Sequence, residues 1–125
     1  MNFSPIQNNT NPLVSVVVCT CNRDQYIGST IDSILNQKIN FTIEILIGDD
    51  ASADGTKEIL LTYKKLYPEI FTLVFHEENQ GIGRNWAGLM KLVKGKYVAL
   101  CDDDDYWHYD EKLQKQIDIL EETSK

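Results

Sequence analysis

Residues 13–19, Leu-Val-Ser-Val-Val-Val-Cys, are the stretch on which the fold of this chain depends. The run is short, almost wholly apolar and rich in β-branched valine. Such a run is typical of a strand that is buried on both faces, because a surface strand would alternate apolar and polar residues. The stretch therefore predicts a parallel sheet covered by helices on its two sides.

The rest of the chain alternates between helix and strand patterns. Apolar residues at helical spacing predict a helix over about 24–37, and the apolar run 41–48 predicts a second strand. A second helix is expected to carry Ser52 and Asp54 as capping residues and to stop at Pro68. The later elements predicted are a strand over 71–76, a helix over 82–93 ended by Gly95, a strand over 96–101, and a helix with Leu113, Ile117 and Leu120 on its apolar face.

Strand and helix thus follow one another four times, which predicts an α/β fold. We expect a mostly parallel sheet of about four strands, flanked by helices and joined by right-handed crossovers. Residues 1–12 are polar and aperiodic and predict a flexible tail, followed by one domain over 13–125.

Composition argues against two classes of function. The 125 residues carry 12 Lys and Arg against 19 Asp and Glu, a net charge of −7, whereas nucleic-acid binding relies on a basic face. The apolar runs are far shorter than the roughly 20 residues of a membrane-spanning helix. The start of the chain has no signal-peptide pattern, and the 3 cysteines are expected to be reduced thiols of a cytoplasmic protein.

Polar residues follow the predicted strands at the point where each strand ends. Because the carboxyl ends of parallel strands meet along one edge of a sheet, we expect these side chains to converge there. They are Thr20-Cys21-Asn22-Arg23, Asp49-Asp50 and Asp102-Asp103-Asp104-Asp105. Two unit charges about 4 Å apart repel by roughly 4 kcal/mol at an effective dielectric constant near 20. Either some of these acids are protonated or extend into water, or a cation holds them together. A hard divalent cation, Mg²⁺ or Mn²⁺, would also let the site accept a phosphorylated ligand.

Several of these residues also have a simpler interpretation. For Asp49 and Asp50, turn stabilisation and ligand binding both stay open, whereas four aspartates in a row at 102–105 favour a functional role. Asp54 is interpreted as a helix cap. A P-loop and a dinucleotide fingerprint are excluded, because no glycine-rich turn follows the first strand. Arg84 is assigned either to a pyrophosphate or to the surface.

Four blocks of the chain resemble the family 2 glycosyltransferases. Residues 14–23 (VSVVVCTCNR) are similar to the family's opening strand and its Pro-Thr-Tyr-Asn-Arg-like turn. Residues 44–56 (EILIGDDASADGT) resemble a strand that runs into Asp-Asp-x-Ser-x-Asp-Gly-Thr. Residues 79–85 are similar to the third signature, and 95–107 (GKYVALCDDDDYW) resemble the strand that delivers an Asp-x-Asp metal motif. The blocks stand in the family's order.

The resemblance implies a GT-A fold, with a Rossmann-like nucleotide-binding half, that binds a nucleotide diphosphate sugar with Mn²⁺ or Mg²⁺. Carried over by position, Thr20 and Asp50 would contact the nucleoside, with Asp50 at the base, and Arg84 would lie near the diphosphate. Asp102 would lie near the ribose or sugar, and Asp104 together with Asp102 would bind the metal ion. The other residues of the implied nucleotide-sugar site are Cys21, Asn22, Arg23, Asp49 and Asp103.

Two departures from the family pattern change what the resemblance implies. Cys21 replaces the usual aromatic residue of the first turn, which removes the expected stacking partner of the base. The sequence ends at Lys125, whereas the family's acceptor site and catalytic base come from a second half, so the base is expected beyond Lys125. The chain then corresponds to the donor-binding half of an enzyme, and we expect the isolated fragment to be inactive.

For the whole enzyme, the resemblance implies metal-dependent, inverting transfer of a UDP-linked sugar to a saccharide or other acceptor, in polysaccharide biosynthesis. Attachment of the full-length protein to the inner face of the cell membrane is implied as well. Self-association of this chain is expected through the face that the second half would cover.

Two other functions stay open at this point. A receiver-like signalling module would share the length, the acidity and the alternation of elements. That fold needs an acidic pair after its first strand, however, where this chain has Thr20-Cys21-Asn22. A binding-only remnant without enzymatic activity would keep the same four blocks.

Overall fold

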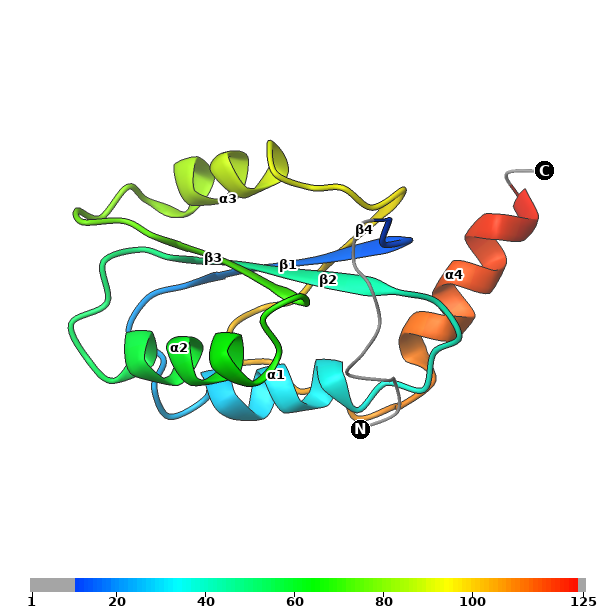
Figure 1. The fold of residues 1–125 in the computed structure, drawn as a ribbon, viewed down its shortest axis with the longest axis horizontal. Coiled ribbons are helices and arrows are strands. Elements are labelled where there is room, and N and C mark those ends of the chain that lie inside the picture. The colour runs from blue at the N-terminus through cyan, green and yellow to red at the C-terminus, as the bar shows by residue number, and fades with distance from the viewer. Residues whose placement is uncertain (1–10, 124–125) are drawn as a thin grey trace.

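The computed structural model describes residues 11–123, which form a parallel sheet with helices on both faces (Figure 1). The strands are β1 (Val14–Thr20), β2 (Ile43–Asp49), β3 (Phe71–Phe75) and β4 (Tyr97–Leu100). The helices are α1 (Ile27–Leu35), α2 (Thr56–Leu66), α3 (Ile82–Met90) and α4 (Lys112–Thr123). The predicted α/β class is confirmed. Of the predicted tail, residues 1–10 lie outside the described residues, while Asn11 accepts a hydrogen bond from Thr42.

The order of the strands is β3-β2-β1-β4, with every neighbouring pair parallel. The chain moves outward from β1 to β3 and then crosses back to β4 on the other side of β1, so the direction of winding reverses at β1. Ligands of open parallel sheets bind beyond the carboxyl ends of the strands at such a switch point. A receiver-like fold would instead place its first strand between the second and third. The receiver alternative is therefore wrong.

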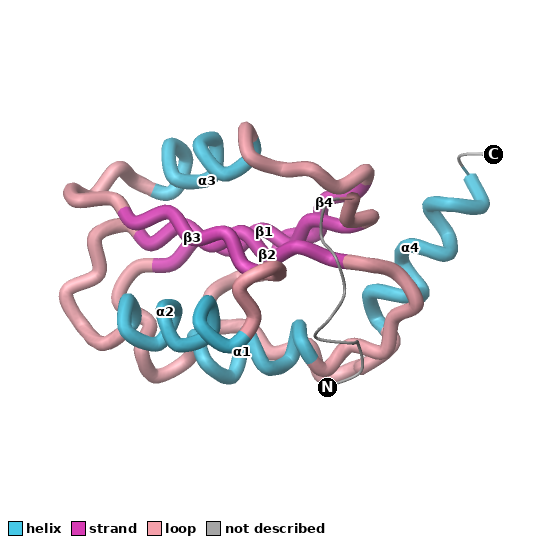
Figure 2. Tube along the Cα trace, in the orientation of Figure 1, coloured by secondary structure: helices cyan, strands magenta, loops and turns pink. Residues whose placement is uncertain are grey.

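Strand β1 is buried on both faces, as its valine run predicts. On one face, Val16 and Val18 pack in a large core with residues of α1, α2 and α4. On the other face, Val17 and Leu46 pack against Leu89 of α3. Figure 2 shows α1 and α2 on the side of the sheet opposite to α3. The sequence pattern thus predicted correctly that β1 is buried on both faces.

Helix α1 begins at Ile27, not near residue 24 as the apolar spacing predicts. Asp24 is held outside the helix because its backbone amide donates to Asp54 and its carboxylate accepts from the amide of Gly55, both at 3.1 Å. Ser52 does not cap α2, as was predicted, because its hydroxyl binds the carboxylate of Asp49. The N-cap of α2 is Gly55, not Asp54, although the carboxylate of Asp54 accepts a 2.9 Å hydrogen bond from the amide of Thr56, the first residue of the helix.

Gly95 lies beyond the end of α3, but it does not end that helix as predicted. The helix stops at Met90, and Gly95 is needed for a close approach to β1, because a Cβ atom there would lie 2.7 Å from the amide nitrogen of Ser15. Ser15 Oγ in turn donates to Glu44, a carboxylate only 3% exposed, which also accepts from the amide of Lys94. The predicted apolar position Leu120 is 43% exposed.

A buried side chain of α3 binds this helix to the sheet. Asn85 is 1% exposed, and its amide donates a 2.9 Å hydrogen bond to the carbonyl oxygen of Gly48 in β2. Its carbonyl oxygen lies 3.2 Å from Nε2 of His76. A Cβ atom on Gly48 would lie 1.9 Å from that oxygen, so only glycine lets the helix approach so closely.

We expect Gly48→Ala to lower the free energy of unfolding by about 1–3 kcal/mol, the usual cost of overpacking. Gly88→Ala is the matched control, because a Cβ atom at Gly88 in α3 meets nothing within 4 Å. The control should gain about 0.5–1 kcal/mol from helix propensity. Urea unfolding measures both, and equal stabilities of Gly48→Ala and the wild type would contradict this account of how α3 is seated.

Candidate functional site

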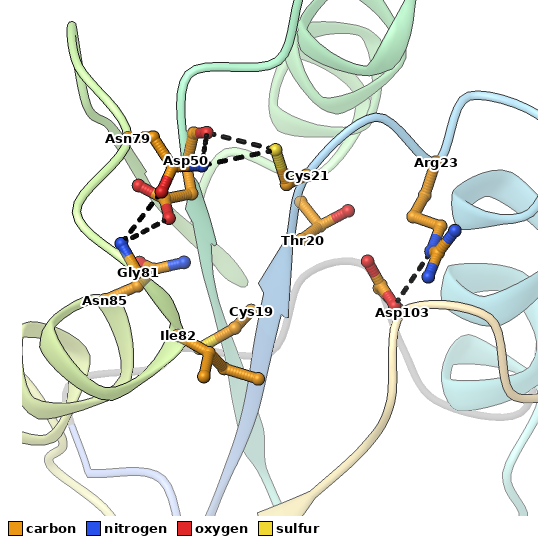
Figure 3. A pocket seen from close by; sticks show the side chains of 10 residues that line it. All are labelled: Cys19, Thr20, Cys21, Arg23, Asp50, Asn79, Gly81, Ile82, Asn85 and Asp103. Carbon is orange, nitrogen blue, oxygen red and sulfur yellow. Dashed lines mark hydrogen bonds and ion pairs between the residues drawn. The ribbon is translucent and has the colours of Figure 1, made fainter.

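A hollow of about 280 Å³ opens at the carboxyl edge of the sheet, beside the switch point at β1 (Figure 3). Its volume is near the lower end of small-molecule sites, roughly 300–1,000 Å³. Residues from the ends of β1 and β2, from the segment that leads into α3, and from the acidic loop after β4 contribute to it. They are Cys19, Thr20, Cys21, Arg23, Asp50, Asn79, Gly81, Ile82, Asn85 and Asp103.

The structure brings half of the predicted site residues together in this hollow. Those that line it are Thr20, Cys21, Arg23, Asp50 and Asp103. Those that do not line it are Asn22, Asp49, Arg84, Asp102 and Asp104.

Thr20 is the polar residue of the hollow that stands out. It is 3% exposed, and its hydroxyl is the one buried side-chain oxygen or nitrogen within residues 11–123 that has no hydrogen-bond partner. Burying a hydroxyl without a partner costs free energy, so a hydroxyl of this kind in a hollow favours a bound water molecule or ligand as its partner. Figure 3 shows Thr20 between the Asp50 side of the hollow and the Arg23–Asp103 pair.

Asp50 shapes the hollow by holding the turn that leads into α3. Its carboxylate, in a residue only 4% exposed, accepts a 2.6 Å hydrogen bond from the amide of Gln80 and a 2.9 Å bond from the amide of Gly81. Gly81 has a φ of 85°, a conformation that favours glycine. A turn role is therefore observed for Asp50. Each carboxylate oxygen still has capacity for a further hydrogen bond.

Asn22 joins the loops that follow β1 and β2. Its φ is 54°, a left-handed conformation that asparagine tolerates. Its amide donates to Ser52 Oγ at 2.9 Å, and its side-chain oxygen accepts from the amide of Ala53 at 2.7 Å. Ser52 also binds Asp49, so Asn22 and Asp49 support the neighbouring loops without lining the hollow.

The thiols of the site are free and protonated near neutral pH. Burial, with added repulsion from Asp103 and Asp50, raises the pKa of Cys19 to about 11. Burial likewise raises the pKa of Cys21, whose Sγ lies 3.1 Å from the carbonyl oxygen of Asp50. A protonated thiol is a poor nucleophile and a poor metal ligand, so these residues serve as neutral walls of the hollow.

The acidic segment forms a turn in which the amide of Asp105 donates to the carbonyl oxygen of Asp102 at 3.1 Å. The carboxylate of Asp103, 17% exposed, pairs with Arg23 at 3.5 Å. Asp102 and Asp104 are exposed, and neither carboxylate has a hydrogen bond or ion pair within residues 11–123. Two carboxylates with free oxygens therefore flank one that is already paired.

The expected convergence of all strand-end acids on one cation is not observed. Asp49 and Asp50 are held by Ser52 and by the backbone of residues 80–81, as described above. In the described part of the chain, no three His, Cys, Asp or Glu side chains gather as a metal site. Arg84 lies on the exposed surface of α3.

Sequence reasoning missed four residues of the hollow that come from one segment, namely Asn79, Gly81, Ile82 and Asn85. The signal was present, because residues 79–85 form the third of the four blocks, but only Arg84 was chosen from it as a site residue. Asn85 could have been found as a polar residue on the apolar face of a predicted helix. Cys19 was missed because it was treated as part of the buried strand.

Comparisons with known proteins agree with this geometry. The sequence model described as "Glycosyl transferase family 2" matches residues 15–125. TuaG of Bacillus subtilis, whose name describes a teichuronic acid biosynthesis glycosyltransferase, is 42% identical over 118 residues, which cover 93% of this chain and 45% of TuaG.

Solved structures are also similar. The crystal structure of S. aureus TarS 1–349 in complex with UDP matches with a TM-score of 0.78 and 29% identity, over 87% of this chain and 32% of TarS 1–349. A mannosyltransferase from Pyrobaculum calidifontis, in complex with GDP-Man and Mn²⁺, matches with a TM-score of 0.76 and 26% identity, over 90% of this chain and 32% of that one.

The chain spans less than half the length of each of these relatives. No helix within residues 11–123 is long and apolar enough to cross a membrane. The expected GT-A fold is confirmed by the structural matches. By its sequence and its fold, this chain belongs to the glycosyl transferase family 2.

Proposed function

We propose that this chain is the donor-binding half of a glycosyltransferase that transfers a sugar from a nucleotide diphosphate sugar to a saccharide or other acceptor. One observation carries the assignment of the donor site: the hydroxyl of Thr20 is buried without a partner in the hollow at the switch point of the sheet. Membership of the family supports the reaction class, and the TarS complex with UDP supports a uridine nucleotide.

In this proposal the nucleoside occupies the hollow of about 280 Å³. Asp50 accepts from an N–H group of the base with the capacity that the Gln80 and Gly81 amides leave over, and Thr20 completes its hydrogen bonding on the ligand. Arg23 lines the hollow whereas Arg84 does not, so Arg23 is better placed to contact the diphosphate. Asp50 therefore has two roles, one in shaping the site and one in binding.

The carboxylates of Asp102 and Asp104 suit a hard divalent ion, Mn²⁺ or Mg²⁺. Ions that accompany phosphates are commonly bound by only one or two carboxylates, with the substrate's phosphates supplying further ligands. Two such carboxylates are exposed and unpaired here within the described residues, and the mannosyltransferase structure contains Mn²⁺. When bound, the ion would stabilise the charge that develops on the departing nucleoside diphosphate.

The remaining parts of the reaction belong to the longer enzyme. We place the catalytic base and the acceptor site beyond Lys125, so that this chain binds the donor without transferring it, and we retain inversion at the sugar as part of the proposal. The name of TuaG supports a role in polysaccharide synthesis. The free thiols of Cys19, Cys21 and Cys101 suit a reducing compartment, and we propose that the enzyme acts in the cytoplasm.

Asp104→Asn tests the metal assignment. With UDP at 100 times its dissociation constant and Mn²⁺, the wild type should gain about 2.7 kcal/mol of stability in thermal unfolding. In the wild type, a chelator should remove the part of this gain that depends on Mn²⁺. The variant should lack that part, so that its gain with Mn²⁺ equals the gain of the wild type in chelator. Asp118→Asn in α4 makes the same charge change away from the site and should keep the full gain. An undiminished Mn²⁺-dependent gain in Asp104→Asn would remove Asp104 from the site.

Thr20→Val separates ligand binding from stability. Removing the unpartnered hydroxyl should raise the free energy of unfolding by about 1 kcal/mol, because a buried group that lacks a hydrogen bond is lost. The dissociation constant of UDP should rise by about tenfold, because the same hydroxyl no longer bonds the ligand. Calorimetric titration and urea unfolding measure the two effects. Thr72→Val in the edge strand β3 should leave UDP binding unchanged, and a Thr20→Val variant that binds UDP like the wild type would contradict the site.

We further propose that the isolated chain associates with a second copy through the face between α3 and β4. Strand β4 is an edge of the sheet, and Ile82, Trp86 and Leu100 beside it are 78%, 39% and 59% exposed. Unpaired strand edges with apolar neighbours favour such pairing.

Sedimentation equilibrium should therefore show a dimer that Leu100→Lys weakens, because a charge would replace the exposed apolar side chain. Leu66→Lys, at a 62% exposed leucine of α2 on the other side of the sheet, should not weaken it. A wild type that stays monomeric at high concentration would contradict the proposal.

A further inference from the structure

The acidic turn after β4 is held from beneath by a buried hydroxyl of α1. Thr30 is 1% exposed, and its Oγ1 lies 2.6 Å from the carbonyl oxygen of Asp105 and 3.1 Å from that of Asp103. The two carbonyl groups belong to the residues on either side of Asp104. A single hydroxyl, which shares its one hydrogen between the two carbonyl oxygens, thus contacts the backbone on both sides of the proposed metal ligand.

The segment 101–111 belongs to no helix or strand itself, because β4 ends at Leu100 and α4 begins at Lys112. A second buried polar residue secures the far end of the segment. Gln37, 0% exposed, donates to the carbonyl oxygen of Tyr109 and accepts from the amide of Leu113, both at 2.9 Å. Lys38, just beyond α1, also donates its amide to the carbonyl oxygen of Asp110 at 2.7 Å. Of these contacts between the loop and α1 or its carboxyl end, the Thr30 contact is the one at the aspartates.

The contacts of Asp103 leave its neighbours available for a ligand. Its carbonyl oxygen is bound to Thr30 and its carboxylate to Arg23. Asp102 and Asp104 are exposed and have no hydrogen-bonding or charged partner within residues 11–123. Metal ligands bind well only when groups behind them fix their orientation. The hydroxyl of Thr30 contacts two backbone carbonyl groups of this turn, and the buried thiol of Cys101 contacts a third, that of Asp102, at 3.5 Å.

We propose that Thr30 is a positioning residue for the divalent ion of the donor site. Its hydroxyl fixes the carbonyl groups of Asp103 and Asp105, and thereby the placement of the Asp102 and Asp104 carboxylates. This inference rests on the proposed function of the site. Without the hydroxyl, two carbonyl groups lose their partner, and the turn relaxes toward conformations in which water can replace it.

The test compares Thr30→Val, which removes the hydroxyl, with Thr30→Ser, which keeps it. Ser33→Ala is the matched control, because Ser33 is 2% exposed in the same helix and donates to the carbonyl oxygen of Thr30 at 2.7 Å, away from the acidic turn. Calorimetric titration gives the dissociation constant of UDP for each protein, once with Mn²⁺ and once with chelator. The dissociation constant in chelator divided by the dissociation constant with Mn²⁺ measures the contribution of the ion; we call this quotient the ratio. Thermal unfolding gives the stability of each variant.

The ratio should fall by about tenfold in Thr30→Val, the usual effect of removing a group that orients a metal ligand, while the constant in chelator stays within about twofold. Thr30→Ser should keep the wild-type ratio, and so should Ser33→Ala even if it is less stable. An unchanged ratio in Thr30→Val, or a lost ratio in Thr30→Ser, would overturn the inference alone. A wild type whose UDP binding does not depend on Mn²⁺ would overturn the metal site of the proposed function and this inference with it.

Discussion

The complete burial of strand β1 is the constraint on which the rest of the structure depends. Its residues Val14–Val18 are at most 2% exposed, so both faces need helices and both edges need strands. The sheet satisfies this by winding outward through β2 and β3 and then returning to β4. At its carboxyl end, the strand passes out of the core formed by these helices and strands. Thr20, Cys21 and Arg23 therefore line the hollow at the carboxyl edge of the sheet, where the neighbouring strands also end.

Local patterns predicted the parts of the molecule that local physics determines. The valine run gave the central strand, and the strand-end rule placed Thr20 and Asp50 at one edge before any contact was known. The contacts that shape the site join segments far apart in sequence, and no periodicity reports them. Asp50 holds the amides of residues 80–81, and Thr30 holds the turn at 103–105. The burial of Thr30 and the identity of its partners become known only with the fold.

The acidic groups around the proposed donor site are of two kinds, which differ in how many of their oxygens already accept hydrogen bonds from the protein. The carboxylates of Asp49 and Asp50 already accept hydrogen bonds from Ser52 and from the amides of residues 80–81, and these bonds hold the side of the hollow proposed for the base. Asp102 and Asp104 keep their oxygens free at an exposed turn. Occupied acceptors beside unpaired carboxylates would suit a nucleotide whose base is recognised by shape and hydrogen bonds and whose phosphates are recognised through charge.

The position of β4 next to β1 also has a consequence for synthesis of the protein. The pairing of Val14 with Tyr97 joins residues that are 97 − 14 = 83 positions apart, so one edge of the valine-rich strand β1 stays without its partner until residue 97 has been synthesised. At about 5–20 residues per second, that interval lasts roughly 4–17 seconds. During this time the nascent chain presents a valine-rich strand edge to its surroundings, which makes the order of emergence from the ribosome, and protection by chaperones, part of how this fold is reached.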